Sequence, residues 1–363
     1  MKKINFYSGP AILPEEVLEQ AQEALKDFAG TGLSILEVSH RSKEFEKVMQ
    51  ESRALAKELM QLNDNYEVLF LQGGASTQFC MVPMNLLNED ETAAYMDTGQ
   101  WAHEAMEEAK NFGKVHIACS SKESNYNFIP KLSSNEWQEA SGRYKYVHLT
   151  SNNTIYGTQL NPSYYAPLAT HHSLVVDMSS DIFSRQLDYS QFDLIYASAQ
   201  KNFGGAGVTM VAVNKNVLGT VNRSIPKMMD YRVHIKKDSM HNTPSVFAVY
   251  VTYLTLKWTK QQGIKQIEER NIRKAKNLYD AIDASNIFEG TVAKDDRSLM
   301  NVCFVMKDKA LEGKFLTYAE ERGIVGIKGY RTVGGFRASL YNAMPELGVE
   351  VFVQTMKAFE SAQ

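Results

Sequence analysis

The chain has 363 residues, with 39 lysines and arginines against 42 aspartates and glutamates, so its formal net charge is −3. Hydrophobic residues make up 44% and charged residues 22%, which is the balance of a folded protein and excludes disorder as the main state. The near-neutral charge argues against a general nucleic-acid-binding protein, which needs a basic face. The length is enough for roughly two domains of about 150 residues each.

The chain has three cysteines, Cys80, Cys119 and Cys303, and no C-x-x-C spacing occurs among them. An odd number also leaves at least one cysteine without a disulfide partner in the chain. This argues against a disulfide framework and favours a reducing compartment. No apolar segment of a secretion signal follows the first lysines, and the most apolar stretch (246–258) is shorter than the ~20 residues of a membrane span. The histidines include no H-E-x-x-H pair, so no metal site is expected. We therefore expect a cytoplasmic protein that binds neither membrane nor nucleic acid.

Taken in chain order, most of the sequence predicts an alternation of helices and strands. A helix begins at Pro14, where apolar residues recur every three or four positions. The elements that follow are helix 44–62, strand 66–72, helix 77–87, strand 92–96, helix 101–112 and strands 114–118, 144–150, 173–177, 193–198 and 208–213. Strands separated by helices favour a mostly parallel sheet that is covered on both faces.

The pattern changes after a long helix at 245–262. A charged helix, a strand and two further helices follow, at 264–283, 301–306, 313–322 and 347–361. The sequence thus predicts an α/β protein with a large domain over residues 15–260. Residues 1–14 and 261–363 are expected to form a smaller α+β domain.

Asp177 and Lys201 are the first residues that indicate a chemistry. Each follows an apolar strand, and ligands of parallel sheets collect beyond the carboxyl ends of the strands. The two could form a plain salt bridge. A lysine in the apolar, glycine-flanked segment SAQKNFGGAG is also suited to Schiff-base chemistry, because burial lowers the pKa of an ammonium.

That chemistry points to pyridoxal 5'-phosphate (PLP). Its aldehyde needs a lysine, its ring nitrogen a carboxylate and its phosphate exposed backbone N–H groups. The turn from Gly73 to Ser76, between a strand and a helix, offers such N–H groups, although turns of this kind also occur without a ligand. Trp101 could cover a flat ring or pack in the core. Thr154 could bond the cofactor's phenolic oxygen or lie in a plain loop.

A series of motifs runs through the whole chain in the order of one family. They are FYSGPAILP, EVSHRSKEF, QGGASTQF, NNTIYGTQ, VVDMSSDIFSR, YASAQKNFGGAGVT, HNTPSVFAVY and KGYRTVGGFRASLYN. In these motifs the chain resembles the phosphoserine aminotransferase family, in the class V group of fold-type I PLP enzymes. The resemblance implies a large α/β/α domain with a seven-stranded, mostly parallel sheet, and a small α+β domain.

The resemblance also implies roles around the cofactor. Lys201 would form the Schiff base and move a proton, and Asp177 would keep the ring nitrogen protonated. The other cofactor contacts would come from Trp101 on the ring, Thr154 on the phenolic oxygen, and Ala75, Ser76 and Gln200 on the phosphate. In the family, Asn242 and Thr243 reach the phosphate in the neighbouring subunit of a homodimer. We expect Thr243 to cap the long helix, with Pro244 in its first turn.

On the substrate side, the family pattern places Arg337 on the α-carboxylate. His40, Arg41 and Arg331 would hold the distal anion, with Ser8 near that pocket. Without this pattern, Arg41 and Arg331 would be read as solvated surface charges. The sequence departs from the family at two positions: many members carry His in place of Tyr330, and some carry Arg in place of Ser76. A tyrosine hydroxyl can donate a hydrogen bond to a phosphate but supplies no charge.

The implied reaction is reversible amino transfer between L-phosphoserine plus 2-oxoglutarate and 3-phosphohydroxypyruvate plus L-glutamate, in serine biosynthesis. Some family members also act in pyridoxine (vitamin B6) biosynthesis, and the residues leave that open. An alanine–glyoxylate aminotransferase would not need both Arg41 and Arg331. A cysteine desulfurase needs a mobile nucleophilic cysteine, whereas Cys303 lies in the apolar run NVCFVM.

Two further alternatives receive less support from the residues. A dinucleotide-binding oxidoreductase is disfavoured because the glycine-rich segment 204–207 precedes a strand and not a helix. A non-catalytic protein on the same fold is disfavoured because Lys201 and Asp177 are both present.

Overall fold

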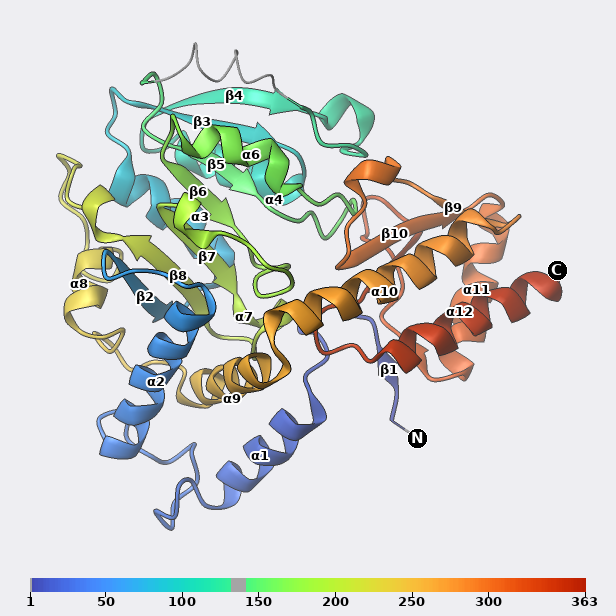
Figure 1. Ribbon diagram of the computed structural model, residues 1–363, viewed down its shortest axis with the longest axis horizontal. Coiled ribbons are helices and arrows are strands. Elements are labelled where there is room, and N and C mark those ends of the chain that lie inside the picture. Colours follow the sequence, from blue (N-terminus) through green and yellow to red (C-terminus); the bar gives the residue numbers. More distant parts are fainter. Residues whose placement is uncertain (1, 132–141) are drawn as a thin grey trace.

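The computed structural model describes residues 2–131 and 142–363. Its largest sheet has seven strands, in the spatial order β2-β8-β7-β6-β5-β3-β4 (Figure 1). Their bounds are β2 Tyr66–Leu71, β3 Thr92–Asp97, β4 Lys114–Ser120, β5 Val147–Thr150, β6 Leu174–Asp177, β7 Leu194–Ser198 and β8 Thr209–Asn214. Only β8 is reversed: it is antiparallel to both β7 and β2, while β3 to β7 pair in parallel. The expected seven-stranded, mostly parallel sheet is confirmed.

Helices cover both faces of this sheet because its strands are apolar on both sides. Along β2, Val68 and Phe70 pack into one hydrophobic cluster, whereas Leu69 and Leu71 pack into another. The first cluster includes α2 (Lys43–Leu59), α6 (Pro162–Ala169) and α9 (Val246–Gln262). The second includes α3 (Gly74–Leu86), α4 (Gln100–Ala109) and α8 (Tyr231–Lys236). The short helix α7 (Ala199–Asn202) follows β7 directly.

The C-terminal part has its own sheet and core. Its antiparallel sheet has the order β12-β10-β9, formed by Phe336–Ser339, Asn301–Met306 and Phe288–Gly290. A separate hydrophobic cluster joins this sheet to α10 (Ile264–Asp283), α11 (Glu312–Glu321) and α12 (Glu346–Ser361). The N-terminal strand β1 (Ile4–Asn5) pairs in parallel with β11 (Ile324–Val325). The domain boundary near residue 260 stays a prediction, since α9 and α10 are separated by Gly263 alone.

One expected helix start is wrong. The first helical residue of α9 is Val246 and Ser245 precedes it, so Thr243 does not cap the helix and Pro244 lies outside its first turn. The Thr243 carbonyl oxygen instead accepts a hydrogen bond from Gln72 Nε2 at 3.2 Å. This contact lies beside the end of β2 and holds the segment before the helix in a non-helical path.

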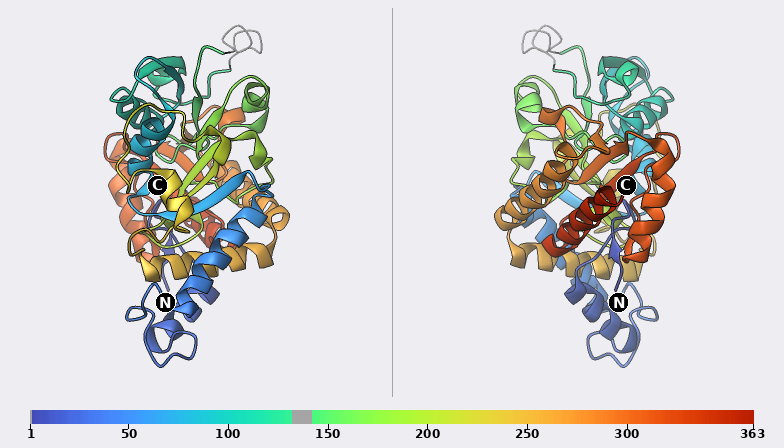
Figure 2. Two further views of the ribbon diagram at one scale, coloured as in Figure 1. Left: turned by 90° about the vertical axis from the view of Figure 1, so that its left-hand side faces the viewer. Right: turned by 90° about the vertical axis from the view of Figure 1, so that its right-hand side faces the viewer.

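The helix α1 (Glu15–Lys26) and the loop after it project from the lower end of the molecule in Figures 1 and 2. Within the described residues, no helix has the length and apolar character that a bilayer crossing requires.

Candidate active site

The strand directions bring the main candidate residues to one edge of the large sheet. Strands β3, β5, β6 and β7 all end at this edge, where ligands of parallel sheets bind. Asp177 is the last residue of β6, and Lys201 lies in α7 immediately after β7. Trp101 lies in the first turn of α4 after β3, and Thr154 lies in the loop after β5. Residues far apart in the sequence therefore meet at one place.

Direct contacts join three of these residues to Arg337 on β12. Lys201 Nζ lies over the Trp101 ring, 5.8 Å from its centroid. Trp101 Nε1 donates a hydrogen bond to Thr154 Oγ1 at 3.2 Å, and Arg337 Nη1 donates one to the Thr154 carbonyl oxygen at 3.0 Å. The Arg337 Nε atom is buried and has no hydrogen-bond partner among the described residues. Its N–H group thus remains able to bind another group.

Asp177 and Lys201 are electrostatically coupled. Burial raises the pKa of the Asp177 carboxyl above its ordinary value, while the positive charge of Lys201 acts to lower it. Burial lowers the pKa of the Lys201 ammonium, Asp177 opposes this effect and the charge of Arg337 adds to it. A lysine whose amine is more easily deprotonated is a better nucleophile and a better proton carrier near neutral pH.

Two serines that the sequence reading did not single out connect Asp177 to the start of α3. The Ala75 N–H donates to Ser198 Oγ at 2.8 Å, and the Ser198 N–H donates to Ser179 Oγ at 3.0 Å. The Ser179 N–H in turn donates to Asp177 Oδ1 at 2.8 Å. In a common type of turn, an aspartate side chain accepts a hydrogen bond from the backbone N–H group two residues later. The spacing Asp-x-Ser could therefore have indicated Ser179.

The turn between β2 and α3 is built for a close approach of the backbone. Gly73 and Gly74 have φ values of 95° and 68°, and a Cβ atom on Gly73 would lie 2.0 Å from Thr77 Oγ1. Because α3 begins at Gly74, Ala75 and Ser76 lie in its first turn, slightly earlier than the predicted helix start at 77. N–H groups in the first turn of a helix suit a phosphate, although that of Ala75 is directed at Ser198 Oγ here.

The N-terminal segment closes one side of the site. The Ala11 N–H donates to the Gln200 carbonyl oxygen at 2.9 Å, and a Cβ atom on Gly9 would lie 3.4 Å from Lys201 Cγ. The neighbouring Ser8 is held through its carbonyl oxygen, which accepts from the Tyr341 hydroxyl at 2.7 Å. Ser8 and Gln200 are thus brought to the neighbourhood of Lys201.

Tyr330 and Arg331 lie in the exposed loop between β11 and β12. This loop borders a cleft of 640 Å³ whose lining includes Tyr156, Cys303 and Val333. Burial raises the pKa of Tyr156, and the nearby charges of Asp97 and Tyr330 add to the effect. The cleft therefore connects the loop that carries Arg331 with the loop that carries Thr154.

The other expected residues lie in two further segments of the chain. His40 and Arg41 lie between α1 and α2, directly before the start of α2. Asn242 Nδ2 donates to Gln72 Oε1 at 3.2 Å, which places Asn242 and Thr243 beside the end of β2.

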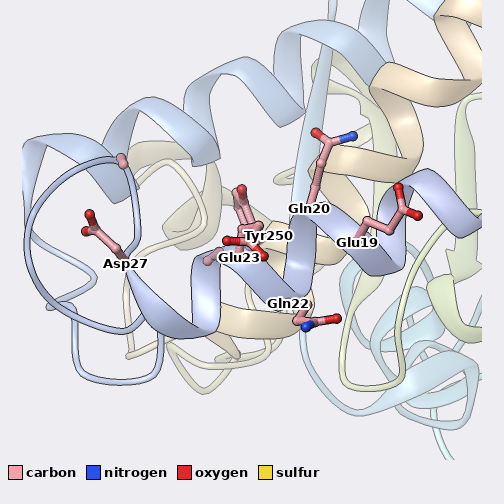
Figure 3. Close-up of a pocket in the computed structure, with 8 residues that line it drawn as sticks. Glu19, Gln20, Gln22, Glu23, Asp27 and Tyr250 are labelled. Carbon is pink, nitrogen blue, oxygen red and sulfur yellow. The ribbon is translucent and has the colours of Figure 1, made fainter.

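A further cavity lies away from these residues, between α1 and α9. It has a volume of 510 Å³, and Figure 3 shows Glu19, Glu23 and Asp27 on its α1 side and Tyr250 beside them. Three carboxylates repel anions, so this cavity does not suit a phosphate or a dicarboxylate.

The three cysteines are free thiols, and burial raises the pKa of each. The values are about 11 for Cys80 and about 12 for Cys119 and Cys303. A thiol that stays protonated at neutral pH is a poor nucleophile, which disfavours a desulfurase. Among the described residues, no group of three or more His, Cys, Asp or Glu side chains is placed to hold a metal ion.

Comparisons with known proteins agree with this geometry. The family model described as aminotransferase class-V matches residues 4–352. The phosphoserine aminotransferase of Parabacteroides distasonis is 54% identical over 363 residues, which cover 99% of both chains. The solved phosphoserine aminotransferase from Bacillus circulans subsp. alkalophilus is 44% identical, with 99% of both chains covered and a TM-score of 0.93. A PLP-bound phosphoserine aminotransferase from Trichomonas vaginalis is 33% identical with a TM-score of 0.89, and 98% of this chain and 100% of that one are covered. The chain belongs to the phosphoserine aminotransferase family of the class-V aminotransferases.

Proposed function

We propose that the chain, with PLP as its cofactor, transfers the amino group of L-glutamate to 3-phosphohydroxypyruvate, giving L-phosphoserine and 2-oxoglutarate in serine biosynthesis. The observation that carries the proposal is the coupled pair of Asp177 and Lys201 at the carboxyl edge of the sheet, with Trp101 over the lysine. The relatives named phosphoserine aminotransferase, about half identical over the full length, support the same reaction.

The residues of the site fit PLP. When bound, this cofactor supplies an aldehyde for an amine and a ring that withdraws electrons from the substrate Cα. The buried carboxylate of Asp177 would hold a proton on the ring nitrogen, and Trp101 would cover the ring. Lys201, with its lowered pKa, would take the proton from the substrate Cα and return it on the cofactor side. The first turn of α3, with Ala75, Ser76 and the nearby Gln200, would hold the phosphate, while Thr154 would bond the phenolic oxygen.

Arg337 would bind the α-carboxylate that glutamate and phosphoserine share. It is anchored to the Thr154 carbonyl oxygen by Nη1 and keeps a free Nε. An arginine can grip both oxygens of a carboxylate, which fixes the substrate Cα relative to Lys201.

The distal phosphate or carboxylate of the substrate would lie toward Ser8, Tyr330 and Arg331. We further propose a homodimer in which His40, Arg41, Asn242 and Thr243 complete the site of the other subunit. The projecting position of the loop that carries His40 and Arg41 supports this arrangement. Because Tyr330 is uncharged, binding of the substrate phosphate would depend more strongly on Arg331 and on the partner subunit's Arg41.

The shared role of Arg337 can be tested by steady-state kinetics. Arg337→Ala should raise KM for both phosphoserine and glutamate by about 10- to 100-fold, because the same clamp is removed from each. Arg322→Ala, on an exposed arginine that stacks on Tyr318, is the matched control and should leave both KM values unchanged. A rise for only one of the two substrates would show that they do not share this clamp.

A further inference from the structure

Lys274, on α10, is a buried lysine that the proposed reaction does not use. Only 1% of its surface is exposed. Its Nζ atom donates hydrogen bonds to the carbonyl oxygens of Leu340, Tyr341 and Met344, at 3.0, 2.5 and 3.1 Å. An ammonium has three N–H donors, and all three therefore have acceptors. A buried charge without such partners would be strongly disfavoured.

The charges that face Lys274 come from its own helix and from the start of α12. Burial and the positive charge of Arg270 lower the pKa of Lys274, to about 7, whereas the negative charge of Glu346 raises it. Glu346 is itself bonded by Arg273 at 2.7 Å. Because Glu346 is engaged by Arg273, the hydrogen bonds of the Lys274 ammonium all go to backbone carbonyls. These bonds fix the path of the chain over residues 340–344.

The turn 340–344 lies between the strand that carries Arg337 and the segments that carry Asp177 and Lys201. The Asn342 N–H donates to Asn202 Oδ1 at 2.9 Å, and Asn202 follows Lys201 in α7. Asn342 Nδ2 donates to the Phe183 carbonyl oxygen at 3.0 Å, in the segment that follows Asp177.

Two more contacts attach this turn to its surroundings. Asn271, one turn before Lys274 on α10, donates from Nδ2 to Asn342 Oδ1 at 2.9 Å. The Tyr341 hydroxyl holds the Ser8 carbonyl oxygen. On its other side, the turn continues directly from β12, the strand of Arg337. The turn therefore joins the strand of Arg337 to the segments that carry Asp177 and Lys201.

We propose that Lys274 is a positioning residue for the amino-transfer reaction. By binding three carbonyls of the turn 340–344, it fixes the place of Arg337 in the site, and so how tightly the substrate α-carboxylate is captured beside Lys201. This inference rests on the proposed role of Arg337.

The test is a double-mutant cycle in the PLP-loaded enzyme. Lys274→Met keeps an unbranched apolar stem but removes the ammonium and with it all three donors. It should raise KM for glutamate roughly tenfold, with kcat changed by about threefold or less, since misplacement of a binding group acts mainly on substrate capture. In an Arg337→Lys background the same substitution should raise KM by about twofold or less, because residues that act through each other are not additive. Lys276→Met, at an exposed lysine on the same helix paired with Asp280, is the matched control and should change neither constant.

Two outcomes overturn the inference. Lys274→Met with a wild-type KM, whether or not its melting temperature falls, would show that the lysine serves stability alone. An equal rise in KM in the wild-type and Arg337→Lys backgrounds would show that it does not act through Arg337. If Lys274→Met does not fold, Lys274→Gln, which keeps two N–H donors, is expected to show a smaller rise in KM that again disappears in the Arg337→Lys background. Unchanged KM values in Arg337→Lys itself would contradict the proposed carboxylate clamp and not the contacts of Lys274.

Discussion

Lys201 and Asp177 differ from a surface salt bridge in what burial does to them. The pKa of the lysine is lowered and that of the aspartate is raised, although each charge acts to reverse the shift of the other. A surface pair would keep ordinary pKa values and would contribute little to stability or chemistry. The site therefore maintains a lysine that can give up its proton and a carboxyl that is ready to pair with a buried cation.

Lys201→Ala should abolish turnover, with kcat lower by about a thousandfold or more, because the amine that binds the cofactor and the group that moves the proton are both lost. The measurement is the rate of 2-oxoglutarate formation from glutamate and 3-phosphohydroxypyruvate. Lys309→Ala, at an exposed lysine, should retain the wild-type rate. A near-normal kcat for Lys201→Ala would refute its assignment.

Asp177→Asn should weaken PLP retention and lower kcat by roughly 100-fold or more. The amide has nearly the same shape as the carboxylate but carries no charge to hold a proton on the ring nitrogen. Dialysis followed by measurement of bound PLP, together with kcat at saturating PLP, separates the two effects. A variant that regains the full rate once saturated would limit Asp177 to cofactor binding.

Among the elements, the strand and helix ends position the site side chains. Gly99 precedes α4, the helix of Trp101, and a Cβ atom there would lie 2.1 Å from Oδ1 of the buried Asn153. Asn153 is the neighbour of Thr154, whose hydroxyl oxygen accepts from Trp101. The close approach at Gly99 thus permits the contact between the two residues that would cover the cofactor.

Gly99→Ala should raise the Kd for PLP by about tenfold, because Asn153 or the start of α4 has to move and the contact between Trp101 and Thr154 weakens. The Kd can be measured by titrating the apoenzyme with PLP and following tryptophan fluorescence. Gly313→Ala, where an added Cβ atom would meet no heavy atom within 4 Å, is the control. Equal Kd values for the two variants would show that the close approach does not matter for the cofactor.

The regular elements of the large sheet could be predicted because its strands are apolar runs bounded by turns and its helices have a clear period. The strand β12 was not predicted, since its four residues, FRAS, follow a glycine-rich loop and are too few to show a pattern. The start of α9 was placed at Thr243 on local cap residues alone. A contact with Gln72, 171 positions away, decides the path of that segment instead.

In the site, too, residues marked by a local pattern could be predicted, and contacts between distant segments could not. Asp177 and Lys201 could be found because each follows an apolar strand. The contact of Arg337 with the Thr154 carbonyl spans 183 positions, so only the family resemblance indicated Arg337. Ser179 and Ser198 were missed because serines are common in turns and their bonds to one another depend on the fold.

At the scale of the whole molecule, the loop between α1 and α2 is notable for its exposed apolar side chains. The loop between α1 and α2 projects from the body and exposes Leu33 and Leu36 to 47% and 67%. Large apolar side chains on a projecting loop are typical of a subunit interface. His40 and Arg41 lie in the same loop, which supports their proposed place in the site of a partner.

A mixed dimer tests this proposal. Lys201→Ala and Arg41→Ala chains should each be nearly inactive alone. Co-expressed, they should regain about a quarter of the wild-type activity, since half of randomly paired dimers are mixed and one of their two sites is intact. Purification through two different tags isolates the mixed dimer for the assay. No recovery in that mixed dimer would place Arg41 outside the partner's site.

The most direct test of the proposed reaction is the absorbance spectrum of the purified holoenzyme between about 300 and 500 nm, before and after addition of L-phosphoserine without an oxo-acid. The expected result is loss of a band near roughly 400 nm, gain of a band near roughly 330 nm, and release of one 3-phosphohydroxypyruvate per bound cofactor. Alanine at the same concentration should leave the spectrum unchanged. A spectrum that responds to alanine but not to phosphoserine would contradict the proposed substrate and move the activity to another class-V reaction.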